Sequence, residues 1–381
     1  MRAASVPREP FLRFDAQPVG EIPRRLCFDS PREVLVANTH GEVAPVIHRV
    51  QRALGEGHFA AGYLAYEAGP AFDRALACHP GPTTMPLAWL GIFDRPEDGM
   101  PQRTAGSYVL GHWRTPDGQA RHRAAVDAIR QSIARGEVYQ VNHTFRLQAD
   151  FGGDDETLYE QMVAAQGYAY GAYLRLGRYR VLSASPELFL ERRGDLLTSR
   201  PMKGTVRRSA DTNAEAHAEL RRSPKDRAEN VMIVDLVRND LGRVARPGTV
   251  SVPRLFEVEP YCGVHQMTST VMGTCAPTTT LWDILVALFP AGSISGTPKI
   301  AASRIIAALE DDPRGVYCGA LGYFEPGGDF RLSVGIRTAT LDTTTATLTY
   351  GVGGAITWDS DAVKEYDEAL AKAEVIQRLS C

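Results

Sequence analysis

The sequence predicts an α+β protein that is rich in antiparallel sheet. Strand-like apolar segments follow one another with turns between them and do not alternate strictly with helices. Runs of strands joined by turns are typical of antiparallel sheets, whereas a Rossmann-type sheet needs a helix between successive strands. No internal repeat, charge block or low-complexity linker interrupts the 381 residues. We therefore predict a single domain over residues 1–381.

The individual elements follow in chain order. Residues 1–115 carry apolar runs between Pro- and Gly-containing stretches, which indicates strands and loops. A helix is expected over 121–135, where Ala125, Ile129 and Ile133 recur at helical spacing. Strands are predicted at residues 138–149, 170–176, 179–185, 188–193, 195–200, 249–258, 317–324, 330–340 and 345–353. Further helices are predicted at residues 156–166, 211–222, 224–239, 281–288, 299–309 and 361–379.

Composition excludes several classes of function. The chain has 42 Lys and Arg against 45 Asp and Glu, a net charge of −3, so we expect no nucleic-acid partner. No apolar run is long enough to span a membrane, and the first residues lack the uncharged core of a signal peptide. The cysteines form no Cys-x-x-Cys pair, which favours reduced thiols in a cytoplasmic protein. They are Cys27, Cys78, Cys262, Cys275, Cys318 and Cys381.

Two residues with complementary chemistry are Glu187 and Lys203. Each would usually be a surface residue if it were seen alone. Lys203 lies between Met202 and Gly204, where partial burial would lower its pKa and make its amine a nucleophile. Burial of Glu187 would raise its pKa toward the range of a useful general acid.

Acidic residues are paired at the start of the helix expected from residue 224. Asp226 and Glu229 lie three residues apart, so their carboxylates repel unless a cation separates them. The alternative for Asp226 is a capping box, with Ser223 as N-cap and Pro224 at the first helical position.

The last helix repeats this spacing with Glu365 and Glu368, followed by Lys372. A charged stripe of this kind is usually a solvated helix face. Two helices that each present an acid pair can instead face one another around a hard cation. Carboxylates and water suit Mg²⁺ better than zinc, so magnesium is the metal we expect.

Small-residue segments at 289–306, 335–340 and 350–356 are suited to anions. Backbone N–H groups in such turns bind carboxylates or phosphates, and Arg337 can grip a carboxylate with two nitrogens. Ordinary tight turns are the alternative for the glycines. The first segment lacks the Gly-Lys-Ser/Thr of a phosphate-binding P-loop, so nucleotide binding is disfavoured.

Nine motifs occur in this order along the chain: GEVYQVNHTFRL, SASPELF, RPMKGT, DRAENVMIVDLVRNDLGRV, VHQMTSTV, FPAGSISGTPK, RGVYCGALGY, SVGIRT and EYDEALAK. Taken together, they resemble the motifs of the chorismate-utilising enzymes, the family of the anthranilate, isochorismate, salicylate and aminodeoxychorismate synthases. The resemblance covers residues 118–379, the expected chorismate-binding catalytic core, and is loose over 1–115. It implies a large two-sheet core with flanking helices.

Two positions choose a branch of this family. Gln140 stands where the isochorismate and salicylate synthases carry a water-activating Lys, so water addition is disfavoured. Lys203 matches the Lys of the aminodeoxychorismate branch, where anthranilate synthases carry Ala. The resemblance then implies amination of chorismate at C4, with Lys203 adding to C2 and Glu187 protonating the departing hydroxyl. Anthranilate synthase component I is the nearest alternative, and a non-catalytic chorismate-binding regulatory subunit is an alternative of another class.

The resemblance also implies ligands and partners. Glu229 and Glu368 would bind Mg²⁺ directly, with Asp226 and Glu365 holding its waters. Ammonia would come from solution or from a separate glutamine amidotransferase subunit, because no glutaminase segment is visible. The implied substrate-binding residues are Gln140, Thr205, His265, Ser293, Tyr317, Arg337, Gly351, Gly353, Gly354 and Lys372.

Overall fold

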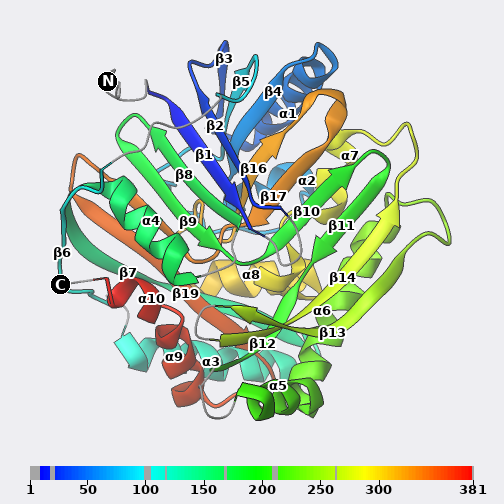
Figure 1. Ribbon diagram of the computed structural model, residues 1–381. Helices are drawn as coiled ribbons and strands as arrows, with labels where there is room; N and C mark the ends of the chain where they lie inside the picture. Colours follow the sequence, from blue (N-terminus) through cyan, green and yellow to red (C-terminus); the bar gives the residue numbers. More distant parts are fainter. Residues whose placement is uncertain are drawn as a thin grey trace.

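A computed structural model describes residues 9–17, 22–97, 104–115, 118–166, 170–207, 213–261 and 264–379. Within these residues the chain forms two large antiparallel sheets with helices around them (Figure 1), which confirms the predicted α+β class. In the same described part, no helix combines the length and the apolar character that a membrane span requires.

The first sheet has nine strands in the described residues. Its strands β7 and β19 lie antiparallel over ten residues of β19. In spatial order the strands are β15 (Gly296–Thr297), β7 (Gln140–Gly153), β19 (Thr347–Ile356), β18 (Thr338–Asp342), β9 (Tyr179–Ser185), β8 (Tyr170–Leu176), β1 (Phe11–Ala16) and β2 (Arg24–Asp29), with β6 (Tyr108–Leu110) beside β7.

The second sheet has ten strands in the described residues and is antiparallel throughout. Its order is β12 (Met202–Arg207), β14 (Val264–Thr274), β11 (Leu196–Arg200), β10 (Leu188–Arg193), β17 (Phe330–Val334), β16 (Ala320–Phe324), β4 (Phe59–Leu64), β5 (Ala88–Phe93) and β3 (Glu33–Ala37), with β13 (Ser251–Tyr261) beside β14. Residues before 97 therefore contribute strands to both sheets.

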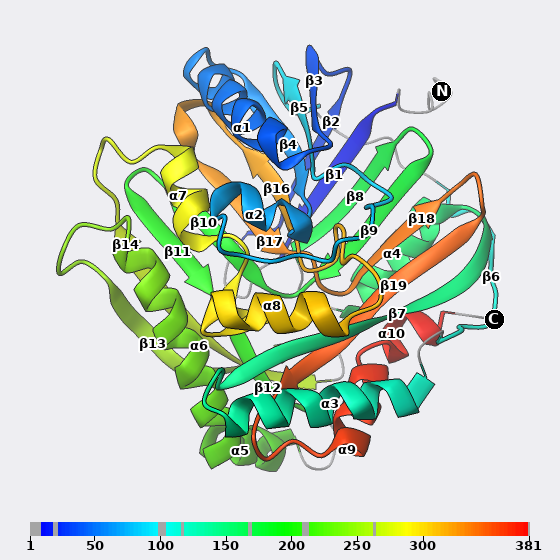
Figure 2. The same ribbon diagram turned by 180° about the vertical axis from the view of Figure 1, so that it is seen from behind.

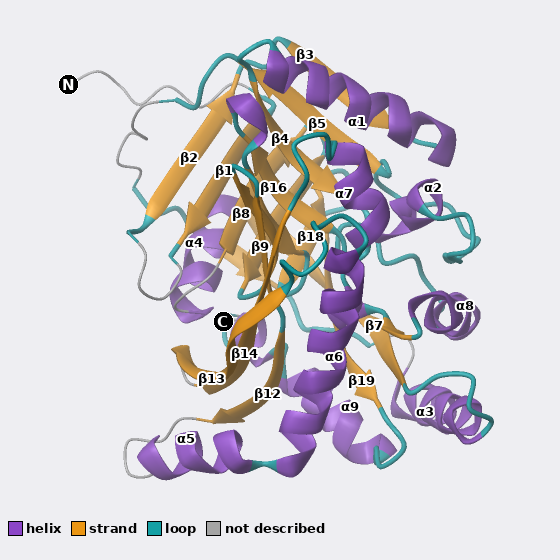
Figure 3. Ribbon diagram, turned by 90° about the vertical axis from the view of Figure 1, so that its right-hand side faces the viewer, coloured by secondary structure: helices purple, strands orange, loops and turns teal. Residues whose placement is uncertain are grey.

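Helices flank both sheets, and several gather at one end of the molecule. Seen from behind, α8 and α3 lie on either side of β7 (Figure 2). Figure 3 shows α3, α5 and α9 below β12, β7 and β19, with α6 running down to meet them. The helices are α1 (His40–Gly55), α2 (Gly69–Phe72), α3 (Gly118–Ala134), α4 (Asp155–Gln166), α5 (Asn213–Arg222), α6 (Pro224–Gly242), α7 (Leu281–Leu288), α8 (Lys299–Leu309), α9 (Ala362–Ala371) and α10 (Glu374–Gln377).

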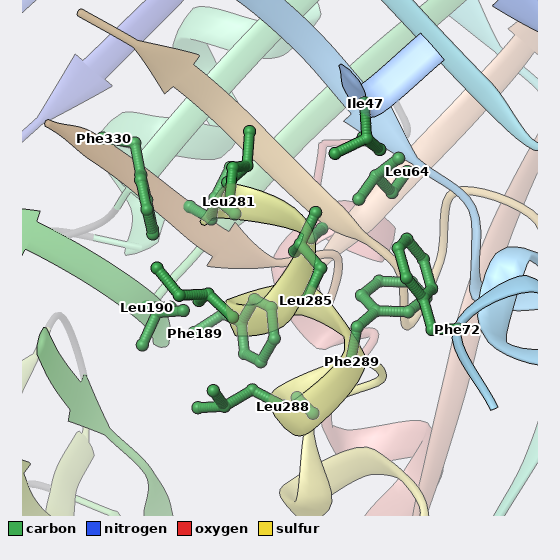
Figure 4. Close-up of a cluster of buried hydrophobic side chains, with 14 of the residues drawn as sticks. Ile47, Leu64, Phe72, Phe189, Leu190, Leu281, Leu285, Leu288, Phe289 and Phe330 are labelled. Carbon is green, nitrogen blue, oxygen red and sulfur yellow. The ribbon is translucent and has the colours of Figure 1, made fainter. Parts of the chain in front are cut away.

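The largest apolar cluster fixes two segments that lead into this end. Phe189 and Leu190 of β10 pack with Leu285 and Phe289 around α7 (Figure 4). The rings of Phe189 and Phe289 meet edge to face, with centroids 6.2 Å apart. Because well-packed aromatic side chains resist displacement, the residues just before β10 and just after Phe289 start from fixed positions.

The structure corrects five local expectations. Helix α1 lies where strands and loops were expected, and its buried Val43, Val46, Ile47 and Val50 have helical spacing. Pro45 hid this pattern, because a proline inside a helix removes one intrahelical N–H donor and usually indicates a break. Strands β12 and β14 were not predicted as strands. The predicted strand 330–340 divides into β17 and β18, which lie in different sheets, and the last helix divides into α9 and α10. Residues 211 and 212 of the predicted helix 211–222 lie outside the described part.

Candidate active site

Glu187 lies in the short link between β9 and β10 and is only 4% exposed. The Ser293 hydroxyl donates a 2.5 Å hydrogen bond to its Oε1 atom, and its backbone N–H donates to the Ser185 hydroxyl at 3.3 Å. Burial raises the pKa of the Glu187 carboxyl to about 7, against the lowering effects of Ser293 and of Lys203. This carboxyl can therefore hold and release a proton near neutral pH.

Lys203 is a half-buried residue of β12, which lies at the edge of the second sheet against α6. Burial lowers the pKa of its ammonium, and the Lys372 charge lowers it further. Glu229, Glu187 and Glu368 act in the opposite direction. The Lys203 side chain is thus within electrostatic reach of all of these groups, and its neutral form is more accessible than that of a solvated lysine.

Gly204 lets β12 approach the start of α6. Its φ is +89°, and a Cβ atom there would come within 2.9 Å of an Asp226 carboxylate oxygen. Any side chain at this position would be strained by the backbone and would push against that carboxylate. The glycine after the lysine is therefore a structural requirement for placing Lys203 beside α6.

The first turn of α6 carries Asp226 and Glu229. Ser223 is the N-cap, and its hydroxyl accepts a hydrogen bond from the Asp226 N–H at 3.3 Å, so one half of the predicted capping box is present. Burial raises the pKa of Glu229, and Asp226 and Glu365 add to this increase, while Lys203 and Lys225 oppose it. Glu229 is therefore close to acids of both helices.

Helix α9 carries the second acid pair. Glu365 is 7% exposed and accepts a 2.7 Å hydrogen bond from the Ser360 hydroxyl, and burial raises its pKa. The Glu368 side chain is 58% exposed and forms a 2.9 Å ion pair with Lys372, which lowers the pKa of Glu368. Lys372 also donates a hydrogen bond to the Gly353 carbonyl at 3.0 Å.

These four carboxylates have the donor chemistry of a magnesium site, since hard oxygen ligands are those that Mg²⁺ prefers. Among the described residues, however, no three acid, histidine or cysteine side chains stand close enough to hold a metal ion as they are. Two ammonium groups lie among them instead, with Lys225 at 3.9 Å from Glu229 and Lys372 on Glu368. The carboxylates of α6 and α9 therefore lie in the same region, but no three of them are within metal-binding distance of one another.

Among the expected anion-binding residues, Arg337, Gly353 and Gly354 lie near Lys372. Arg337 has a φ of +52° and donates a hydrogen bond to the carbonyl of Lys372 at the end of α9. A Cβ atom on Gly354 would be 3.4 Å from the Lys372 ammonium nitrogen. A Cβ atom on Gly351 would come within 2.4 Å of the Tyr317 ring, so glycine is required for this close approach.

Thr205, His265 and Gln140 complete the predicted set of site residues. Thr205 is exposed and its hydroxyl donates to the Gln266 side chain at 3.1 Å. His265 is buried on β14, 5.5 Å from His217 between ring centroids. Gln140 is fully buried at the start of β7, and neither polar atom of its amide has a hydrogen-bond partner within the described residues. The predicted roles of these residues stay predictions.

Sequence reasoning missed two sets of charged residues near the site. Lys225 faces the acids of α6 and α9, and its position one helical turn before Glu229 was a readable signal. Arg314 and Glu310 form a buried ion pair behind the Ser293 segment. The sequence shows their spacing of four residues, but it does not indicate that both are buried or that they bond to residues far away in the chain.

Comparison with known proteins identifies the class. Residues 26–378 match the model of the family described as "chorismate binding enzyme", and the chain belongs to this family. The match extends well into the part of the chain where sequence motifs alone gave only a loose resemblance.

Individual relatives are more specific. The chain is 40% identical over 294 residues to "Aminodeoxychorismate synthase component 1" of Klebsiella aerogenes, which covers 76% of this chain and 63% of that protein. It is 40% identical over 359 residues to "Aminodeoxychorismate synthase" of Streptomyces pristinaespiralis, covering 89% of this chain and 48% of that protein. The chain thus spans less than two thirds of the length of either relative.

Solved structures share the fold. Anthranilate synthase component I from Streptococcus pneumoniae superposes with a TM-score of 0.76 at 24% identity, covering 99% of this chain and 94% of that one. The menaquinone-specific isochorismate synthase from Escherichia coli gives a TM-score of 0.78 at 16% identity, covering 99% and 90%. At these identities the likeness establishes the two-sheet architecture.

Proposed function

We propose that this protein aminates chorismate at C4 with ammonia and gives 4-amino-4-deoxychorismate, a precursor of para-aminobenzoate and folate. The observation that carries the proposal is that Lys203 and Glu187 lie within electrostatic reach of each other in one charged, partly desolvated group of side chains. Lys203 also stands where anthranilate synthases carry Ala, and the relatives at 40% identity are named aminodeoxychorismate synthases.

The proposed reaction has two steps. The neutral Lys203 amine bonds to C2, the ring double bonds shift, and the C4–O bond breaks as Glu187 gives its proton to the departing hydroxyl, which leaves as water. Ammonia then bonds to C4 while the C2–N bond breaks and Lys203 leaves as a free amine. The new ammonium returns one proton to the Glu187 carboxylate, so charge and atoms balance.

The cationic groups around α9 would orient the substrate. Chorismate is a dianion, and Lys372 and Arg337 would hold its carboxylates, with Tyr317 and the backbone of Gly351, Gly353 and Gly354 completing the contacts. Ser293 would keep the acid proton of Glu187 oriented. When chorismate binds, the Lys372 ammonium would leave part of its ion pair with Glu368 and contact a substrate carboxylate instead.

We further propose that Mg²⁺ binds between α6 and α9, held by Glu229 and Glu368 with Asp226 and Glu365 on its waters. When bound, the metal neutralises the ring carboxylate of the substrate. Glu229→Gln should raise the Mg²⁺ concentration required for half-maximal binding by about tenfold or more, since one charged ligand is lost. Isothermal titration with Mg²⁺ and chorismate measures this.

The matched control for the metal is Asp235→Asn, an exposed acid farther along the same helix that pairs with Arg238. This variant should titrate like the unmodified protein. A Glu229→Gln protein whose Mg²⁺ titration equals that of Asp235→Asn would remove Glu229 from the ligand set.

A separate glutamine amidotransferase subunit is the proposed source of ammonia. The name "component 1" of the relatives supports a second component. We place the reaction in the cytoplasm, and the four cysteines among the described residues are free, in keeping with a reducing compartment. Cys262 and Cys381 lie outside the described part.

The experiment that tests the function is product identification. The purified chain is incubated with chorismate, Mg²⁺ and ammonium, and the products are separated by chromatography and identified by mass. The proposal requires 4-amino-4-deoxychorismate without release of pyruvate. Anthranilate with pyruvate would make the chain an anthranilate synthase component, and chorismate that is bound but never converted would make it a regulatory subunit.

A further inference from the structure

A buried ion pair lies directly behind the turn that carries Ser293. Arg314 is 4% exposed and Glu310, the C-cap of α8, is 7% exposed. Two guanidinium nitrogens of Arg314 donate to the two Glu310 oxygens, at 2.9 and 2.6 Å. Burial alone would raise the pKa of Glu310, but the Arg314 charge prevails and lowers it, so the pair is ionised.

The same guanidinium joins two segments of the site. One nitrogen donates to the carbonyl of Ile294, the residue after Ser293 in the short helix Gly292–Ile294, at 2.6 Å. Another donates to the carbonyl of Asn142 in β7 at 2.7 Å. A planar guanidinium holds its N–H groups in a fixed fork. These bonds therefore hold the Ser293 turn to β7 from the Ile294 carbonyl, next to the backbone bond from the Asn142 N–H to the Ser295 carbonyl.

Further bonds fix Arg314 and Glu310 themselves. Glu67 accepts the backbone N–H groups of Arg314 and Gly315, at 2.7 and 2.8 Å. Glu310 accepts both the N–H and the hydroxyl of Thr144, at 2.8 and 2.9 Å. Every oxygen of the two carboxylates thus has a partner, which is the condition for a buried ion pair to be rigid.

We infer that Arg314 is a positioning residue: by fastening the Gly292–Ile294 turn to β7, it holds the Ser293 hydroxyl against Glu187. Arg314 does not touch Glu187, and its effect passes through Ser293 alone. The inference rests on the proposed function only in taking Glu187 as the acid of the reaction.

The test is a direct titration of Glu187. Glutamate labelled with ¹³C at the carboxyl carbon is incorporated, and the Glu187 resonance is identified by its absence in Glu187→Gln. In Arg314→Lys, one ammonium cannot replace the forked contacts, so the Ser293 hydrogen bond is lost. The pKa of Glu187 should then rise by about half to one unit, the worth of one hydrogen bond.

A double-mutant cycle makes the test specific. Ser293→Ala should give the same upward shift, and Arg314→Lys should add nothing in the Ser293→Ala background. Arg13→Lys is the matched control, because Arg13 is equally buried and paired with Asp15 and Glu160 away from this turn. It should leave the Glu187 titration unchanged.

Two results would overturn the inference: an Arg314→Lys titration like that of the unmodified protein, or a shift that persists in full when Ser293 is already Ala. If Arg314→Lys does not fold, Glu310→Gln, which frees the guanidinium without changing side-chain volume, must shift the same resonance upward. The titration needs no turnover. A chain that fails to aminate chorismate yet shows these shifts refutes the proposed function and leaves the positioning role standing.

Discussion

Lys203→Ala should reduce formation of 4-amino-4-deoxychorismate by about 10³-fold or more, because the variant lacks the group that forms the covalent bond to C2. The expected loss lies in kcat. Binding of chorismate with Mg²⁺ should persist, since Lys372 and Arg337 remain. Rates come from chromatographic product analysis at saturating ammonium, and binding is measured by isothermal titration.

Lys364→Ala is the control for this change. Lys364 is an exposed lysine on α9, the helix that carries Glu365 and Glu368, so its removal tests for a general effect of charge near the site. The control should retain most of its activity. Amination by Lys203→Ala at the rate of Lys364→Ala would exclude the covalent role.

Glu187→Gln should lower the rate by about 10²- to 10⁴-fold, the usual contribution of a general acid. The pH dependence gives the sharper readout. Glu187 must carry a proton to release the hydroxyl, and its pKa is about 7, so the rate of the unmodified protein should fall as the pH rises above about 7. It should also fall toward acidic pH as Lys203 becomes protonated. The variant should keep only the acidic decline.

Glu191→Gln controls for loss of a carboxylate on the neighbouring strand β10, where Glu191 pairs with Arg331 at 2.6 Å. Its rate should decline at alkaline pH as the unmodified protein's does. A Glu187→Gln profile that still falls at alkaline pH with the same midpoint would assign that ionisation to another group.

Much of the fold could be predicted because its signals are local. Apolar patterns and turn residues from 118 onward place most strands and helices within a few residues of their observed bounds. The failure at α1 was also local, because one proline obscured a helical pattern formed by Val43, Val46, Ile47 and Val50. Packing between distant segments decides which strands pair within the two sheets, so a local sequence pattern could not predict the strand order.

In the site, too, contacts within one helix could be predicted from the sequence, whereas contacts between distant segments could not. The spacing of Glu365, Glu368 and Lys372 predicts neighbours on one helix face, and the structure shows the ion pair between the last two. The Arg314 network joins residues as far as 247 positions apart, from Glu67 to Arg314. Such contacts exist only after the sheets have formed, so chain spacing could not indicate that Arg314 acts on the Ser293 turn.

The covalent step is the centre of the account, and intact-mass analysis with peptide mapping tests it directly. The protein is mixed with chorismate and Mg²⁺ without any source of ammonia and is quenched in acid. The account predicts a mass increase of one chorismate less one water, located on the peptide that contains Lys203 and discharged when ammonium is added before the quench. A protein that remains unmodified under these conditions while aminating chorismate at full rate with ammonium, or an adduct on a different residue, would contradict it.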